Sequence, residues 1–382
     1  MSEADPLPEA DCRAEALHPR FAPHVIGHDD IRAQIFAAIE SQEMHHAWLL
    51  TGPEGIGKAT LAWAMARCLL AAPVPGAEEG LFGPEPLPFD PSLCLSPDHP
   101  ISHRVKALSE PRLSLVRRRY DSKAGRFQQN ISVEDIRQLK RGFTMASTEP
   151  GYRVAIIDSA DDMNIPAANA LLKLLEEPPL NTILLLISHR PSRLLPTIRS
   201  RCRMMRLAAL DAGQISQILA AQDLDDDSDE YSAQLARLSE GSAGRALTLL
   251  AQDGMALQAR LLALLGSLPN YDRSAAWALA DHISARDGEE KRHLMLDLLE
   301  QILGDLARFG VTQALPYGAS PEEGALFARL SPNPMAGRAW AQAQQEIPAR
   351  ARIGLAVNLD PGSLTLDMVR SLERTAQTCL PI

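Results

Sequence analysis

The sequence lacks an excess of basic residues, and this absence limits the kinds of protein it can encode. Its 38 Lys and Arg residues are outnumbered by 48 Asp and Glu residues, which gives a formal net charge of −10. A chain with this charge is not a general nucleic-acid binder, so any DNA contact must come from a local patch or a partner. The sequence also lacks a run of about 18 apolar residues and, in its acidic first residues, the features of a signal peptide. We therefore expect a soluble cytoplasmic protein without a membrane contact.

Cysteines and closely spaced metal ligands are also scarce. The five cysteines are scattered without a Cys-x-x-Cys pair, which argues against a disulfide scaffold and a four-cysteine zinc site. Cys94, His99 and His103 lie near one another in sequence, and Cys68 precedes them, but structural zinc sites use close ligand pairs. We expect none of these residues to be a metal ligand, and zinc in particular is not expected.

Aromatic residues make up only 4% of the chain, whereas 46% of its residues are hydrophobic and Leu and Ala dominate. This composition favours helices packed around well-formed cores. The chain has 382 residues, which is too long for one ordinary core, so we expect about two or three domains.

The most informative stretch is a glycine-rich turn between a short apolar run and a helical segment, at residues 51–60. Glycines allow the chain to wrap closely around a phosphate, so that backbone N–H groups and the helix N-terminus face the anion. The pattern requires Ser or Thr directly after the lysine to hold Mg²⁺, but this position is Ala59. We predict a phosphate-binding loop whose nucleotide-binding residues are Gly52, Gly55, Gly57, Lys58 and Thr60.

Further apolar runs alternate with helical segments after this loop. Residues 153–157 form a β-branched run that ends at Asp158, and residues 182–187 form a second buried run. Strands that alternate with helices predict a parallel sheet, with ligands bound at the carboxyl ends of the strands. Asp158 therefore has the position of the carboxylate on the metal side of a nucleotide.

The distribution of these runs also predicts the domains. Proline-rich residues 1–23 are expected to form a flexible arm, and the nucleotide-binding-type domain is expected at 24–209. This domain would contain an irregular insertion at about 73–130. No strand-like run follows residue 210, so we predict a small helical lid at 210–255 and an all-helical domain at 256–382.

One dense basic run stands out in the acidic sequence. Arg117, Arg118 and Arg119 are followed closely by Lys123 and Arg126. The run is either a solvated, mobile loop or a contact to the phosphate backbone of DNA. The sequence favours the solvated loop and leaves the DNA contact open.

Four features occur in one order: the phosphate loop, the strand ending in Asp158, Leu-Leu-Lys-Leu-Leu-Glu-Glu-Pro-Pro at 171–179, and Ser200-Arg201-Cys202. In this combination the chain resembles the clamp-loader subunits of bacterial DNA polymerase III, within the AAA+ family, and it is most similar to the delta-prime type. The resemblance is strong over about residues 20–210. It implies an α/β AAA+ domain with a parallel sheet, a helical lid and an all-α C-terminal collar domain for oligomerisation.

The resemblance assigns roles to further residues. Arg201 matches the arginine that reaches in trans into the ATP site of a neighbouring subunit, where its fixed charge stabilises the developing charge on the γ-phosphate. Ser188 matches the sensor-1 position and Arg245 the sensor-2 position. ATP and Mg²⁺ are the cofactors that the resemblance implies. The zinc module of these subunits is reduced here to Cys68 and Cys94.

Two departures from the family pattern affect ATP hydrolysis. Active members carry a glutamate after the strand to orient water, but Ser159 follows Asp158 here and cannot act as that base. Ala59 removes the hydroxyl that usually holds Mg²⁺. We therefore predict that the chain hydrolyses ATP weakly or not at all, although it can still bind ATP.

The function that the resemblance implies is to help load the sliding clamp on primed DNA during replication. The implied partners are tau/gamma-type and delta subunits in a hetero-pentamer, with the clamp and DNA contacted through the complex. The alternatives are an ATP-hydrolysing tau/gamma-type subunit, another AAA+ remodelling ATPase, and a structural scaffold with a vestigial phosphate loop. Nucleotide binding by the isolated chain would separate a working loop from a vestigial one.

Overall fold

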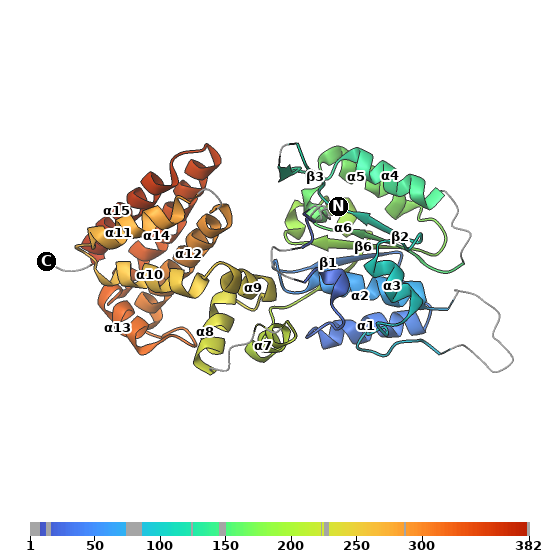
Figure 1. Ribbon diagram of the computed structural model, residues 1–382, viewed down its shortest axis with the longest axis horizontal. Coiled ribbons are helices and arrows are strands. Elements are labelled where there is room, and N and C mark those ends of the chain that lie inside the picture. The colour runs from blue at the N-terminus through green and yellow to red at the C-terminus, as the bar shows by residue number, and fades with distance from the viewer. Residues whose placement is uncertain are drawn as a thin grey trace, which may run out of the picture. The chain divides into compact units, whose positions relative to one another are not determined.

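The computed structural model describes residues 8–12, 17–73, 86–123, 125–144, 150–222, 224, 229–285 and 288–379. The chain divides into two compact units (Figure 1). Unit 1 comprises Met1–Asp225 with Gly241–Arg245, and unit 2 comprises Asp226–Glu240 with Ala246–Ile382. This division falls within residues 210–255, the range that we assign to a lid.

Unit 1 is built on a five-stranded sheet with the order β2-β5-β6-β1-β7, in which all neighbouring strands are parallel. The residues of β1 and β6 are buried along the whole of both strands. Strands that are covered on both faces have continuous apolar sequences, which is the pattern seen here. The predicted parallel α/β fold is confirmed. The strands are β1 (Ala47–Thr51), β2 (Leu113–Val116), β5 (Arg153–Ile157), β6 (Thr182–Ser188) and β7 (Arg203–Arg206).

Helices cover both faces of this sheet (Figure 1). Successive strand residues point to opposite faces, so Trp48 and Leu50 pack with α1 and α2, whereas Ala47 and Leu49 pack with α4 and α5. The two cores hold the carboxyl ends of β1, β5 and β6 at a common edge. The larger helices of unit 1 are α1 (Asp29–Glu40), α2 (Lys58–Ala71), α4 (Val133–Thr144), α5 (Ile165–Glu176) and α7 (Ala212–Ala220).

The structure corrects the predicted irregular insertion at 73–130. α3 (Pro100–Lys106) and β2 lie inside this range, and β2 pairs with β5 from Leu113↔Val154 to Val116↔Ile157. β2 is an edge strand with three partly exposed residues, so it lacks the uninterrupted apolar run that marks the central strands. Residues 74–85 lie outside the described residues.

The structure also differs from the flexible arm expected at 1–23. Arg67 of α2 donates from both terminal nitrogens to the carbonyl oxygens of Arg20 and Ala22, each at 3.0 Å. His18 is buried and packs edge-on against Trp63, with 5.7 Å between ring centroids. The described residues 17–22, which include η1 (Pro19–Phe21), are therefore fixed on α2. Residues 1–7 and 13–16 lie outside the described part of the chain.

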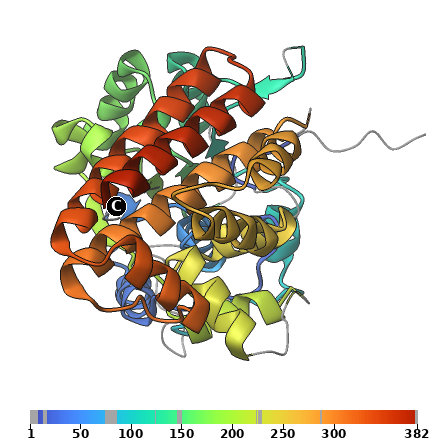
Figure 2. The same cartoon turned by 90° about the vertical axis from the view of Figure 1, so that its left-hand side faces the viewer.

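The regular secondary structure described in unit 2 consists of helices, as predicted for the C-terminal part. α12 packs along α14, and α15 packs on both α14 and α11 (Figures 1 and 2). The crossing of α12 and α14 is close, because a Cβ added to Gly310 would lie 2.7 Å from the Cα atom of Gly337. The helices are α8 (Asp229–Ser239), α9 (Ala243–Ala251), α10 (Gly254–Gly266), α11 (Arg273–Ile283), α12 (Glu289–Thr312), α13 (Pro321–Leu330), α14 (Pro334–Ala356) and α15 (Pro361–Cys379).

None of the described helices has the length and apolar character needed to span a membrane.

Candidate nucleotide site and arginine finger

The predicted phosphate loop connects β1 directly to α2, and its three glycines adopt positive φ angles. Gly57 is the N-cap of α2 with φ of 97°. Gly55 has φ of 76°, and a Cβ there would lie 2.3 Å from the hydroxyl oxygen of Ser242. Side chains are disfavoured in this conformation and have no space at Gly55. Gly52 is held at the end of β1, against the backbone of Leu207.

The donor groups of this loop fit a phosphate. Among the described residues, the backbone N–H groups of Gly55, Ile56 and Gly57 donate to no protein acceptor. Lys58 is buried, and its Nζ donates to the carbonyl oxygen of Gly52 at 2.7 Å and to that of Pro53. The loop thus combines unsatisfied N–H donors with a fixed ammonium group, which is the donor set that an anion at a helix N-terminus requires.

Residues after β5 form the second side of the site. Asp158 directly follows β5, and its N–H donates to the carbonyl of Val116 at 2.9 Å. Ser159 has φ of 56°, and its hydroxyl lies 3.2 Å from Nε2 of His189. The carboxylate of Asp161 accepts from the N–H of His189 at 3.1 Å. Ser159 and His189 are therefore in contact at the carboxyl end of β5.

The electrostatic environment of Asp158 opposes ionisation. Burial raises the pKa of its carboxyl group to about 7, and the negative charge of Asp11 raises it further, against smaller opposing effects that include Lys58. A neutral carboxyl group is a poor ligand for Mg²⁺. A cation at this position would have to displace the proton that Asp158 holds around neutral pH.

The two sensor candidates also lie in unit 1. Ser188 ends β6 beside Thr51 of β1, and its buried hydroxyl has no hydrogen-bond partner in the part of the chain that the structure describes. Arg245 lies in the first turn of α9, and its backbone N–H donates to Ser242 at 3.1 Å. Ser188 therefore places a buried hydroxyl group at the carboxyl edge of the sheet.

Three contacts to the phosphate loop were not predicted from the sequence. His28, the N-cap of α1, lies 2.8 Å from the carbonyl oxygen of Ile56 through Nε2, and burial lowers the pKa of this imidazole. The hydroxyl of Ser242 donates to the carbonyl of Glu54 at 2.8 Å, and the N–H of Gly244 donates to that of Gly55 at 2.9 Å. These contacts join residues distant in sequence, so no local pattern marks them.

Arg201 lies at the amino edge of the sheet, where the parallel strands begin, and not at the carboxyl edge that carries the phosphate loop. It precedes β7, whose pairing with β1 starts at Trp48↔Arg203 and ends at Thr51↔Arg206. Three strand steps of about 3.3 Å, or about 10 Å in all, therefore separate the amino edge from the start of the phosphate loop. The Arg201 guanidinium bonds to Glu176 at 2.9 Å and to the Thr197 carbonyl at 3.0 Å. The structure thus groups the predicted loop residues, Asp158 and Ser188 but separates Arg201 from them.

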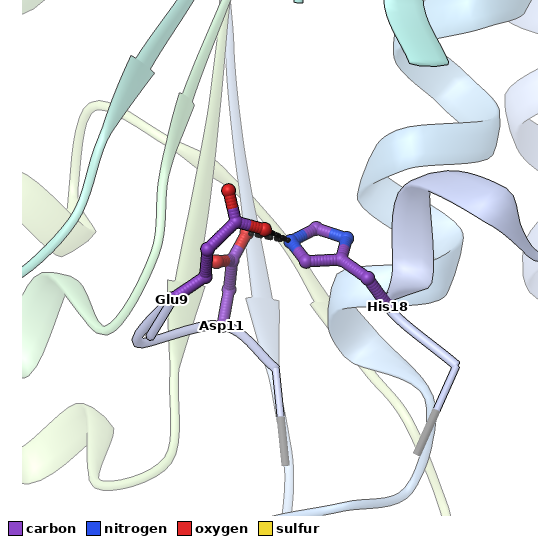
Figure 3. Close-up of side chains that lie close together, drawn as sticks. All are labelled: Glu9, Asp11 and His18. Carbon is purple, nitrogen blue, oxygen red and sulfur yellow. Dashed lines mark ion pairs between the residues drawn. The ribbon is translucent and has the colours of Figure 1, made fainter. Parts of the chain in front are cut away.

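Glu9, Asp11 and His18 form a cluster in which three potential metal-ligand atoms lie within 4.8 Å of one another (Figure 3). Nε2 of His18 lies 3.0 Å from Glu9 and 3.2 Å from Asp11. Arg117 also bonds to both carboxylates, at 2.7 Å in the case of Glu9. Its guanidinium would repel a cation, so we interpret the cluster as a network of ion pairs. The network holds residues 8–12 beside the end of β2.

The cysteines considered for zinc have protein partners in the structure. The thiol of Cys68 is buried, which raises its pKa, and it donates to the carbonyl of Leu93 at 3.5 Å. The thiol of Cys94 donates to the carbonyl of Pro23 at 3.5 Å. His99 accepts from the N–H of Ile101 at 3.2 Å and caps α3. These contacts stabilise the local fold around α3.

Comparison with known proteins supports the assignment made from the motifs. The family described as "DNA polymerase III, delta subunit" matches residues 99–211. The chain is 38% identical to DNA polymerase III subunit delta' of Pseudomonas aeruginosa over 200 residues, which are 52% of this chain and 53% of the relative. The resemblance to delta-prime subunits is confirmed.

Other relatives are more distant. The chain is 31% identical to subunit delta' of Bacillus subtilis over 192 residues, which are 50% of each chain. It is 26% identical to DNA polymerase III subunit tau of Escherichia coli over 337 residues, or 83% of this chain and 48% of the relative. The chain thus spans about half the length of the curated relatives it matches. A solved DNA polymerase III gamma subunit-related protein from Thermotoga maritima aligns with a TM-score of 0.40 and 16% identity, over 90% of this chain and 99% of that one.

Proposed function

We propose that this chain acts as the delta-prime subunit of a DNA polymerase III clamp loader and helps to load the sliding clamp on primed DNA. The similarity to subunit delta' of P. aeruginosa supports this function. The observation that carries it is the position of Arg201 at the amino edge of the sheet, away from the phosphate loop of the same chain. An arginine finger placed there acts on a neighbouring subunit.

The chemical role of Arg201 is to stabilise charge in trans. Its guanidinium presents several donors in a fixed plane and stays protonated, so it can bind the γ-phosphate of ATP held by a partner. The side chain is 36% exposed, so it is accessible despite its bond to Glu176. Donating to phosphate instead of Glu176 would exchange one charged acceptor for another.

The chain's own site has a different role in this proposal. Gly52, Gly55, Gly57 and Lys58 would hold the phosphates of ATP, and Thr60, Ser188 and Arg245 would contribute further polar groups. Bound ATP with Mg²⁺ would supply negative charge that neutralises Lys58 and organises the loop. Hydrolysis would be weak or absent, because Ser159 cannot deprotonate water and Ala59 offers no metal ligand.

The remaining parts of the proposal concern assembly. Residues 24–209 would form the AAA+ domain, 210–255 the lid, and 256–382 the collar through which the chain joins tau/gamma-type and delta subunits in a hetero-pentamer. The clamp and primed DNA would be contacted within that complex, and the location would be cytoplasmic.

Reconstitution with the tau/gamma-type, delta and clamp proteins of the same organism tests this function. The expected result is a stable complex that loads the clamp on primed DNA and loses loading when this chain is omitted. Failure of the full-length chain to join the complex, or full loading without it, would refute the proposal.

A second candidate is an ATP-hydrolysing tau/gamma-type subunit, favoured by the alignment with E. coli tau over 83% of this chain. The two functions differ in the isolated protein. If the isolated protein shows substantial ATPase activity and Lys58→Ala abolishes it, the second candidate is established. ATPase activity at background level would support the delta-prime function.

A further inference from the structure

The basic run after β2 differs in charge from the rest of the chain. Residues 117–127 contain five basic side chains and one acidic side chain, in a protein of net charge −10. Arg117 takes no part in a surface patch, because it turns inward to Glu9 and Asp11. The four basic residues that remain near the surface are Arg118, Arg119, Lys123 and Arg126.

Arg118 and Arg119 are held in place but remain accessible. Arg118 pairs with Asp162 at 3.1 Å and is 35% exposed, and Arg119 pairs with Asp135 at 2.5 Å and is 51% exposed. A guanidinium group has five N–H donors, so one carboxylate partner leaves others for a second anion. These ion pairs orient the two arginines and reduce the conformational entropy lost on binding.

A small hairpin carries the other two basic residues. β3 (Tyr120–Asp121) and β4 (Arg126–Phe127) pair antiparallel, apart from the five-stranded sheet (Figure 1). The rings of Tyr120 and Phe127 pack edge to face at 5.3 Å, and Arg118 lies over the Phe127 ring at 6.0 Å. Lys123 and Arg126 are exposed, and neither side chain has an ion-pair partner among the described residues.

A cavity of about 690 Å³ opens at the base of this hairpin. Arg118, Arg119 and Tyr120 contribute to its lining, together with Ser114, Gln138 and two carboxylates, of Glu9 and Asp135, which pair with Arg117 and Arg119. Basic groups along a groove beside a partly exposed aromatic ring form the combination that binds nucleic-acid strands.

We propose that Arg118, Arg119, Lys123 and Arg126 form a binding surface for the phosphate backbone of DNA. The choice of DNA as the polyanion rests on the proposed function, which brings the chain to primed DNA. Lys123 and Arg126 contact phosphates directly, and Arg118 and Arg119 extend the contact towards the cavity. Without base-edge contacts, the surface binds with little sequence preference and strong dependence on salt.

The double variant Lys123→Ala/Arg126→Ala tests this surface, because neither side chain supports the fold through an ion pair. The matched control is Arg338→Ala/Arg370→Ala, which removes two exposed charges from unit 2. Binding of the full-length chain to fluorescent primed, single-stranded and duplex DNA is measured by anisotropy across a salt series. The hairpin variant should bind about tenfold or more weakly at low salt. Its log–log salt slope should fall by about 1.4 for single strands or about 1.8 for duplex, and the control should match the wild type.

Equal affinities and slopes for the wild type and the hairpin variant would overturn the inference, as would a lack of DNA binding by the wild type at low salt. These results leave the proposed function standing if the reconstituted complex still loads the clamp. Loss of assembly, by contrast, would refute the function without changing DNA binding by the free chain. Preference for single-stranded or duplex probes would identify which part of primed DNA this surface contacts.

Discussion

The guanidinium of Arg201 lies 2.9 Å from the carboxylate of Glu176, so one ion pair joins the turn before β7 to the last residue of α5. The two side chains are 36% and 49% exposed. Exposed pairs of this kind contribute about 0–1 kcal/mol to stability. The pair therefore orients Arg201 at the sheet edge while leaving it able to move to a phosphate.

Arg201→Ala should abolish the function of one ATP site in the reconstituted clamp loader. Removing an arginine finger lowers phosphoryl-transfer rates by about 10³-fold or more at the site it serves. Clamp-stimulated ATPase activity and loading on primed DNA should both fall, with subunit assembly unchanged by size-exclusion chromatography. Arg199→Ala, two residues earlier, is the control. Unchanged loading by the Arg201 variant would contradict the role of Arg201 as an arginine finger.

Glu176→Gln should leave loading intact or increase it. The substitution removes the charged competitor for the Arg201 guanidinium but keeps a side chain of the same size. The expected change in thermal stability is below about 1 kcal/mol, because the pair is exposed. A loss of loading as large as that of Arg201→Ala would mean that the ion pair itself, and not a phosphate contact, is the functional state.

Lys58→Ala should weaken ATP binding by the isolated chain at least about tenfold, because it removes the buried ammonium group that we assign to the loop phosphates. Binding is measured by isothermal titration with ATP and with a non-hydrolysable analogue. Ala59→Ser is the companion variant and should strengthen Mg²⁺-dependent binding by restoring a hydroxyl ligand. Identical affinities for all three proteins would indicate a vestigial loop.

Asp158→Asn should stabilise the protein more at pH 8 than at pH 5. The pKa of Asp158 is raised to about 7 in the folded protein, chiefly by burial and next by Asp11, from an ordinary value of 3.8. The folded state therefore binds a proton that the unfolded chain has released, and stability falls as pH rises from about 4 to 7. Asn carries no charge and avoids this loss. Calorimetric melting temperatures across this range, with the exposed Asp98→Asn as control, measure the difference; parallel curves would contradict the assignment.

Arg117→Ala should destabilise unit 1 by about 1–3 kcal/mol, because it removes one of the charged partners of the Glu9 and Asp11 carboxylates, which among the described residues keep only His18 and Arg20. Burial alone would raise the pKa of Asp11, but hydrogen bonding from His18 and the charge of Arg117 outweigh it and lower the pKa. This contribution is present above the ordinary pKa of 3.8 and is lost as pH falls through the lower folded value, so the variant and wild type should converge only below pH 3.8.

Arg118→Ala provides the comparison for Arg117, because its pair with Asp162 is partly exposed and should contribute about 1 kcal/mol or less. Urea unfolding of both variants at neutral pH decides between the two roles. Similar losses in stability would show that the inward contacts of Arg117 do not anchor the N-terminal residues.

The sequence by itself identified the phosphate loop, the strand that ends at Asp158 and the substitution at Ser159. These features are local, since the period of apolar residues and the chemistry of neighbouring side chains are visible in consecutive positions. It also identified Arg201, through the resemblance of Ser200-Arg201-Cys202 to a family motif. The sequence could not decide whether Arg201 forms an ordinary salt bridge or acts as an arginine finger on a neighbouring subunit. Both contacts use the same guanidinium.

Only the tertiary structure decided which of these residues meet. The strand order puts β7 beside β1, so Arg201 lies at the amino edge and Gly52 at the carboxyl edge of the same sheet. The fold also pairs Arg117 with Glu9 and Asp11. The arginines of the basic run, which look equivalent in the sequence, therefore have different surroundings. Such contacts depend on strand pairing and burial between residues far apart in the chain, and neither local periodicity nor residue type contains that information.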